Sequence, residues 1–281
     1  LVRSRGLGDV YKRQMLVKGI ETLLKRNGVN VIYGLGRITA PNTVTVELNN
    51  GQRTTVKARN IIIATGSTPT IPPIPGIDGR NVITTDQALD LLHVPDSVLI
   101  IGGGYVGLEF SFIFKGMGSR EIVLVEMMPN LLPSEDETVT SQMKQFMEKK
   151  GITVLTSARI LKISEGRDNK KLILVSTIEG EKEFHVDTVL VGTGRTPNSD
   201  GLGLENIGVE TVQGRVPVNA GMQTSAPEVF AVGDVASKFM LAHVAMAEGV
   251  IAAENAMGVA SAIDYSSIPR CVYTDPELAF V

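Results

Sequence analysis

The sequence has few cysteine and aromatic residues: of 281 residues, one is cysteine, none is tryptophan and only 5% are aromatic. A single cysteine cannot form a disulfide within the chain, which argues against a small secreted fold stabilised by disulfides. No stretch approaches the roughly 18 consecutive apolar residues of a membrane span, so we expect no membrane partner. The formal net charge of −3 gives no attraction for nucleic acid. These absences leave a globular chain of about two domains, for which we predict no metal site.

The most informative stretch is residues 98–126, which read VLIIGGGYVGLEFSFIFKGMGSREIVLVE. An apolar run that predicts a strand ends in a G-x-G-x-x-G pattern formed by Gly102, Gly104 and Gly107. A helical stretch and a second predicted strand follow, and Glu126 stands at the end of that strand. The order strand, glycine turn, helix, strand and acid is typical of a dinucleotide-binding unit.

Each residue of this pattern has a physical role. Gly102 permits a sharp turn, Gly104 lets the backbone approach a pyrophosphate, and Gly107 lets the helix pack closely on the strand. The helix N-terminus offers free N–H groups and the positive end of its dipole to phosphates. Glu126 can accept hydrogen bonds from ribose hydroxyls, and its charge would repel a 2′-phosphate. We therefore predict binding of NAD(H) rather than NADP(H). The alternative is a glycine-rich turn in some other α/β protein.

A nine-residue pattern occurs twice, as IIIATGSTP at 61–69 and as VLVGTGRTP at 189–197. Each copy follows a segment with the turn residues of a β-hairpin. The predicted hairpin strands are 43–48 and 52–56 before the first copy, and 172–178 and 183–186 before the second. This repetition predicts two domains of similar build. Two unrelated strands that end in turns are the alternative.

A third predicted strand, in VFAVGDV at 229–235, ends at Gly233 and Asp234. Ligands of open α/β sheets bind beyond the carboxyl ends of strands, where an acid can hold a polyhydroxyl chain. Asp234 is also a good helix N-cap, and a helix is predicted over 241–257.

The segment 134–151 predicts a helix with a capping box formed by Ser134 and Glu137 and a stop at Gly151. One face of this helix is apolar, so we expect it to belong to the core. The face consists of Val139, Met143, Phe146 and Met147.

Together with MLAH at 240–243 and YTDPE at 273–277, these motifs resemble the flavin- and NAD-dependent disulfide oxidoreductases. The closest resemblance is to the dihydrolipoamide dehydrogenase family, and it runs from about residue 15 to residue 281. It implies an α/β fold with two Rossmann-like (FAD/NAD(P)-binding) domains, in which the NAD domain is inserted into an incomplete FAD domain. The implied plan is a non-native leader at 1–14, part of the FAD domain without its first half at 15–93, the NAD-binding domain at 94–198, the FAD domain continued at 199–263 and the start of a truncated dimerisation domain at 264–281.

The resemblance also implies cofactor contacts, position by position. Those to FAD fall on Gly36, Thr65, Gly66, Ser67, Asp234, Met240, Leu241, Ala242 and His243. Those to NAD fall on Gly102, Gly103, Gly104, Tyr105, Val106, Gly107, Leu108, Glu109, Glu126, Ile160 and Gly194. Tyr105 would gate the flavin, although many lipoamide members have an aliphatic residue there. Glu109, one helical turn further on, either lies near the flavin–nicotinamide contact or is a solvated carboxylate.

Three parts of the family's machinery have no counterpart in this sequence. They are a C-x₄-C redox pair, a first G-x-G-x-x-G for FAD, and a late His–Glu acid–base pair. Cys271 has no partner, and we expect it to be a small buried apolar residue. We therefore interpret the chain as a fragment, truncated at both ends, that contains no catalytic residue of the thiol chemistry.

The intact enzyme would convert dihydrolipoamide and NAD⁺ to lipoamide and NADH. It would act as a homodimer on lipoyl domains of 2-oxoacid dehydrogenase complexes, in a bacterial cytoplasm or a mitochondrial matrix. The alternatives are another disulfide reductase, such as a mercuric reductase, a transhydrogenase or NADH oxidase of the same build, or a non-catalytic NAD-binding fragment.

Overall fold

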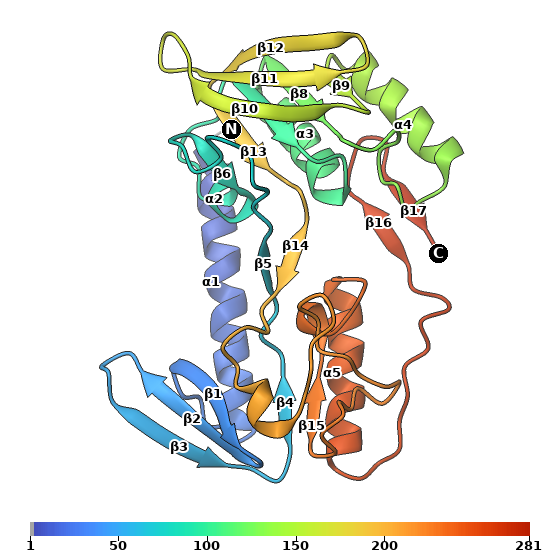
Figure 1. Ribbon diagram of the computed structural model, residues 1–281. Coiled ribbons are helices and arrows are strands. Elements are labelled where there is room, and N and C mark those ends of the chain that lie inside the picture. The colour runs from blue at the N-terminus through green and yellow to red at the C-terminus, as the bar shows by residue number, and fades with distance from the viewer. Residues whose placement is uncertain (1–2) are drawn as a thin grey trace.

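The computed structural model describes residues 3–281, with side chains described from residue 14 onward (Figure 1). Its first element is helix α1 (Arg3–Arg26). This helix runs through most of the segment 1–14 that we predicted to be a non-native leader, and residues 1 and 2 lie outside the described residues. The origin of that segment stays a prediction.

A five-stranded parallel sheet forms the centre of the upper half of the molecule in Figure 1, which we call the larger half. Its strands lie in the order β6 (Val82–Thr84), β13 (Thr188–Val191), β7 (Ser97–Ile101), β8 (Glu121–Val125) and β9 (Thr153–Leu155). All five residues of β7 are buried, as expected for a parallel strand that is covered on both faces. Helix α3 (Tyr105–Met117) connects β7 to β8, so the predicted strand–helix–strand unit is confirmed. β6 pairs with β13, although the resemblance assigned its residues to the FAD domain.

The two faces of this sheet are covered by different elements. Val98 and Ile100 of β7 pack in one core cluster with α3 and with α4 (Glu137–Lys149), whereas Leu99 and Ile101 pack in another with Ile160 and Ile163. The latter two belong to β10 (Arg159–Glu165), which pairs with β11 (Lys171–Thr177), itself paired with β12 (Gly180–Val186). This sheet of β10, β11 and β12 therefore covers one face, and the two helices cover the other.

Helix α4 matches its prediction with two corrections. Its N-cap is Asp136, whose carboxylate accepts a hydrogen bond of 3.1 Å from the Val139 N–H, so the predicted Ser134 capping box is wrong. Met143 and Met147 are fully buried as predicted, but Phe146 is 40% exposed because it lies at the edge of the apolar face. Gly151 adopts a left-handed conformation just after the helix, as its stop signal required.

The predicted repeat is present in the structure. β1 (Gly34–Ala40), β2 (Thr43–Leu48) and β3 (Arg53–Lys57) form another antiparallel meander, which leads into β4 (Ile61–Ile63). The meander of β10, β11 and β12 leads into β13 in the same way. β4 pairs in parallel with β15 (Val229–Ala231). Figure 1 shows the two meanders at opposite ends of the molecule.

The two copies of the repeated motif meet in a short antiparallel ribbon between those ends. It consists of β5 (Ser67–Pro69) and β14 (Arg195–Pro197), in a register that pairs Thr68 with Thr196. The ribbon is flanked by two equivalent backbone hydrogen bonds of 2.9 Å, from Thr70 N to Gly194 O and from Asn198 N to Gly66 O. The chain therefore crosses twice between the two repeated units at one place.

The C-terminal part begins with α5 (Ala242–Ala256) and ends in a hairpin of β16 (Arg270–Val272) and β17 (Leu278–Phe280). Val272 and Leu278 belong to the same core cluster as α3 and α4, so the hairpin packs on the larger half. The remaining short elements are α2 (Thr85–Leu89), η1 (Leu204–Ile207) and η2 (Gly233–Val235). None of the described helices is both long and apolar enough to cross a membrane.

Candidate functional site

The glycine motif forms the corner between β7 and α3, and its three glycines meet different surroundings. Gly102 has a φ of +107°, and a β-carbon there would lie 2.5 Å from the Gly192 oxygen. A β-carbon on Gly107 would lie 1.8 Å from the Gly102 oxygen, so helix and strand are in close contact. A β-carbon on Gly104 would meet nothing within 4 Å. The corner is therefore packed on its inner side and open at Gly104, as the predicted roles require.

The N-terminus of α3 opens at the same corner. Gly104 is the N-cap, and the first amide to bond back is Leu108 N, 3.1 Å from the Gly104 oxygen. The amides of residues 105–107 therefore have no acceptor inside the helix. Such N–H groups, together with the helix dipole, attract an anion.

Glu126 follows β8 and is only 9% exposed. One carboxylate oxygen accepts the Gly103 N–H at 2.5 Å, and the other accepts the Met128 N–H at 2.6 Å. These two bonds fix the carboxylate against the glycine turn. An ionised carboxylate has about four acceptor positions, so it can still accept hydrogen bonds from ligand hydroxyls.

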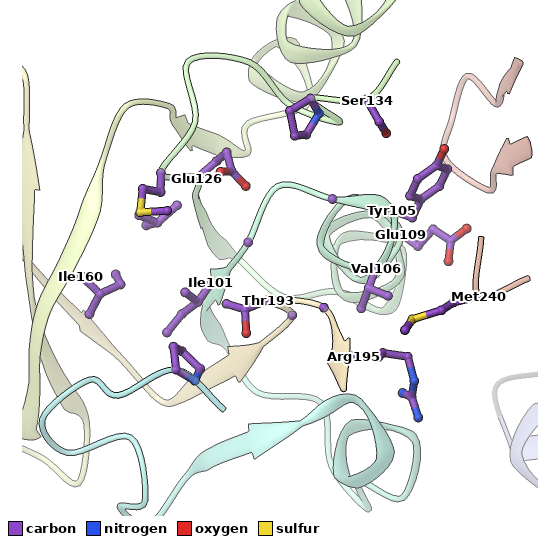
Figure 2. A pocket seen from close by; sticks show the side chains of 18 of the residues that line it. Ile101, Tyr105, Val106, Glu109, Glu126, Ser134, Ile160, Thr193, Arg195 and Met240 are labelled. Carbon is purple, nitrogen blue, oxygen red and sulfur yellow. The ribbon is translucent and has the colours of Figure 1, made fainter. Parts of the chain in front are cut away.

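A cavity of about 1380 Å³ lies over this corner. Figure 2 shows Glu126 and Ile160 at one end of it, and Met240 and Arg195 at the other. Ten of the predicted cofactor contacts line the cavity: Gly102, Gly104, Tyr105, Val106, Glu109, Glu126, Ile160, Gly194, Met240 and Leu241. A run of apolar residues at 72–75 forms part of the wall. One elongated, largely apolar space thus contains the residues that two separate motifs indicated.

Other predicted contacts lie outside that lining. Gly103 and Gly107 shape the corner from behind, and Leu108 is fully buried in the core cluster of α3. The residues outside the lining that we assigned to FAD are Gly36, Thr65, Gly66, Ser67, Asp234, Ala242 and His243. Their roles as cofactor contacts stay predictions.

Several of these residues meet beside the β5–β14 ribbon. Ser67 Oγ donates to an Asp234 carboxylate oxygen at 2.6 Å. The Arg195 guanidinium donates to Ser67 Oγ at 2.6 Å and to the Ser67 backbone oxygen at 2.8 Å. Asp234 does not cap α5, whose N-cap is Leu241, so the alternative role for this acid is wrong. Its carboxylate is therefore held at the strand end by groups from both copies of the repeat.

His243 and Glu109 each contact the C-terminal segment. A His243 ring nitrogen lies 3.0 Å from the Pro269 oxygen. The Glu109 carboxylate accepts the Tyr273 N–H at 3.0 Å, so it is neither free in solvent nor buried. Cys271 is exposed and lines the cavity, which corrects our expectation of a buried residue. The alternation of β16 turns Val272 inward and Cys271 outward.

No motif in the sequence indicated the hydrogen-bond network at the cavity wall. The Tyr105 hydroxyl donates to the Glu135 carboxylate, which also accepts two hydrogen bonds from Arg270, at 2.9 and 3.0 Å. Burial and the Glu135 carboxylate raise the pKa of Tyr105 to about 12. Burial alone would raise the pKa of Glu135, but hydrogen bonds from Arg270 and Tyr105 outweigh it and lower that pKa. The tyrosine is therefore a proton donor and the glutamate is ionised at neutral pH.

Known proteins match this chain over most of its length. The family model described as pyridine nucleotide-disulphide oxidoreductase matches residues 5–249. The chain belongs to this family. It is 38% identical over 270 residues to dihydrolipoyl dehydrogenase 1, mitochondrial, of Arabidopsis thaliana, covering 95% of this chain and 53% of that protein. It is 34% identical over 276 residues to dihydrolipoyl dehydrogenase of Bacillus subtilis, covering 95% and 58%.

A solved structure shows the same fold. The crystal structure of LpdA from Mycobacterium tuberculosis superposes with a TM-score of 0.84 at 27% identity, over 93% of this chain and 58% of that one. The predicted α/β fold and the resemblance are thus confirmed. The chain spans about half the length of the curated relatives it matches.

Proposed function

We propose that this chain provides the NAD-binding site and part of the FAD site of a dihydrolipoyl dehydrogenase. The single observation that carries the proposal is the open corner at Gly104, with the fixed Glu126 carboxylate in the same cavity. Relatives named for this activity support the choice among members of the family. The reaction of the intact enzyme would be dihydrolipoamide and NAD⁺ to lipoamide and NADH.

The residues present fit a bound NAD. The amides at the start of α3 would hold the pyrophosphate, and Glu126 would accept hydrogen bonds from the adenosine ribose. Val106, Met240 and Leu241 give the other end of the cavity an apolar surface, next to the Arg195 guanidinium. When bound, the nicotinamide supplies hydride chemistry, and this chain contributes its position and surroundings.

The residues beside the ribbon fit part of a flavin site. Asp234 already accepts the Ser67 hydroxyl and has further acceptor positions for hydroxyls of a ribityl chain. The two crossings at the ribbon support the proposed plan of an NAD domain inserted into an FAD domain. The boundaries at 93/94, 198/199 and 263/264 belong to this proposal.

The substrate and partners also belong to it. Dihydrolipoyl groups of 2-oxoacid dehydrogenase complexes would be the electron donors, and the intact protein would be a homodimer. Curated relatives of similar identity include bacterial and mitochondrial proteins. A bacterial cytoplasm or a mitochondrial matrix is therefore the proposed location.

The experiment is to read the coding sequence that surrounds this one, and to assay the encoded protein for dihydrolipoamide-dependent reduction of NAD⁺. We expect a C-x₄-C motif upstream and clear turnover. A longer protein with a single cysteine in that place and no dihydrolipoamide activity would refute the lipoamide assignment and favour an oxidase or transhydrogenase. A longer protein with the cysteine pair but another substrate would favour a different disulfide reductase.

A further inference from the structure

Tyr105 is the first residue of α3 and lines the cavity directly after the open corner at Gly104. Its aromatic ring stands at the start of the helix whose first amides would hold the pyrophosphate. Beside it lie the apolar side chains of Val106, Met240 and Leu241. A ring with no other partner would gain by packing on such a surface, since apolar contact is favourable for aromatic groups.

The ring instead has a partner on the opposite side. Figure 2 shows the Tyr105 hydroxyl directed away from Val106 and Met240, toward the side of the C-terminal hairpin. There the hydroxyl donates to Glu135, whose side chain is only 3% exposed. Because both Glu135 oxygens are also held by Arg270, the acceptor is fixed. A charged, buried acceptor gives a stronger hydrogen bond than water would.

The three residues come from separate parts of the chain. Tyr105 begins α3, Glu135 precedes α4, and Arg270 begins β16. The β16–β17 hairpin that carries Arg270 is anchored independently, through Val272 in the core and a 2.6 Å bond from Lys150 to Asp275. The position of the tyrosine therefore depends on how the hairpin docks on the larger half.

We infer that Glu135 and Arg270 are positioning residues, which hold the Tyr105 ring at the cavity edge and so keep the nicotinamide end open. The inference rests on the proposed function, because it concerns the same cavity. Without the hydroxyl or its acceptor, the ring would occupy the apolar end of the cavity in part of the molecules. A ligand that needs that end would then bind only the open fraction, which raises its apparent dissociation constant.

The test compares two ligands on the 281-residue chain. NADH extends to the nicotinamide end, whereas ADP-ribose has the adenosine, pyrophosphate and second ribose but no nicotinamide. We expect Tyr105→Phe and Glu135→Ala to raise the dissociation constant of NADH about three- to tenfold and to change that of ADP-ribose less than about twofold. Glu135→Gln, which keeps an acceptor for the hydroxyl, should fall between these variants and the wild type.

Two controls match these substitutions. Tyr33→Phe removes a hydroxyl from an exposed tyrosine, and Glu137→Gln removes a charge from the exposed first residue of α4; both should bind like the wild type. Tyr105→Phe leaves the Glu135–Arg270 pair intact, so it tests the inference even if Glu135→Ala does not fold.

The ratio of the two dissociation constants separates positioning from damage to the fold. An unchanged ratio in Tyr105→Phe, whether both ligands weaken together or neither does, would overturn the inference, and so would tighter NADH binding. A wild-type chain that binds neither ligand would instead refute the NAD site itself, and this outcome is visible before any variant is made.

Discussion

Replacement of Glu126 by alanine is the substitution whose effect on NADH binding follows most directly from the site geometry. The carboxylate is 9% exposed, lines the cavity and is fixed by the N–H groups of Gly103 and Met128. Alanine removes the proposed acceptor for the ribose hydroxyls. It also releases the Gly103 amide, so the turn loses one of its anchors.

The size of the effect follows from these contacts. A hydrogen bond to a charged group contributes about 1.5–3 kcal/mol, and the ribose would lose at least one such bond. Water can enter the open cavity and partly replace the missing acceptor, so the lower limit of the expected free-energy loss falls to about 1 kcal/mol. We therefore expect Glu126→Ala to weaken NADH binding by about 1–3 kcal/mol, or about 5- to 150-fold in the dissociation constant.

The assay is a titration of the chain with NADH, followed by the fluorescence of the nicotinamide ring. Glu121→Ala is the matched control, because Glu121 is an exposed carboxylate at the opposite end of the same strand. Its dissociation constant should equal that of the wild type. An NADH titration unchanged by Glu126→Ala, in a protein with wild-type thermal stability, would refute the assignment of Glu126 to the ribose.

Three further predictions follow from the same structure. Gly104→Val should abolish NADH binding, while the free energy of unfolding falls by no more than about 1 kcal/mol, because the new side chain enters open space. Gly107→Ala should instead destabilise the fold by about 3 kcal/mol or more, since its β-carbon meets the Gly102 oxygen. Urea unfolding of both variants measures this contrast. Folding lowers the pKa of Glu135, so the ionised carboxylate stabilises the fold above pH 4.5, and this stabilisation is lost as the pH falls through the lowered pKa. The difference in the free energy of unfolding between the wild type and Glu135→Gln should therefore shrink on acidification. A difference that stays constant with pH would contradict this. The 281-residue chain should show no lipoamide-dependent oxidation of NADH, because it has one cysteine, and clear turnover would show that the redox pair is not needed.

Features that depend on neighbours in the sequence could be predicted from it. The corner at Gly102, Gly104 and Gly107 lies within one strand–helix–strand unit, and the acid at the end of its second strand has a fixed spacing. The hairpins before the two repeated motifs could be predicted for the same reason, since their turn residues lie between alternating strands. At these places the neighbouring residues alone determine the local structure.

Features that depend on packing between distant segments could not be predicted. Arg270 and Glu135 are 135 residues apart, and neither stands in a motif that specifies the other. The exposure of Cys271 depends on the face that a three-residue strand turns to its neighbours, which periodicity cannot reveal in so short a segment. The N-cap of α4 is Asp136, two residues after the Ser134 that the sequence pattern indicated.

The central claim is that the β7–α3 corner and Glu126 together bind NAD(H). The most direct test is a comparison of the dissociation constants of NADH and NADPH for the wild-type chain and for Glu126→Ala. We predict tighter binding of NADH in the wild type, because the fixed carboxylate repels a 2′-phosphate, and a smaller preference in the variant. Equal or tighter binding of NADPH by the wild type would contradict the claim.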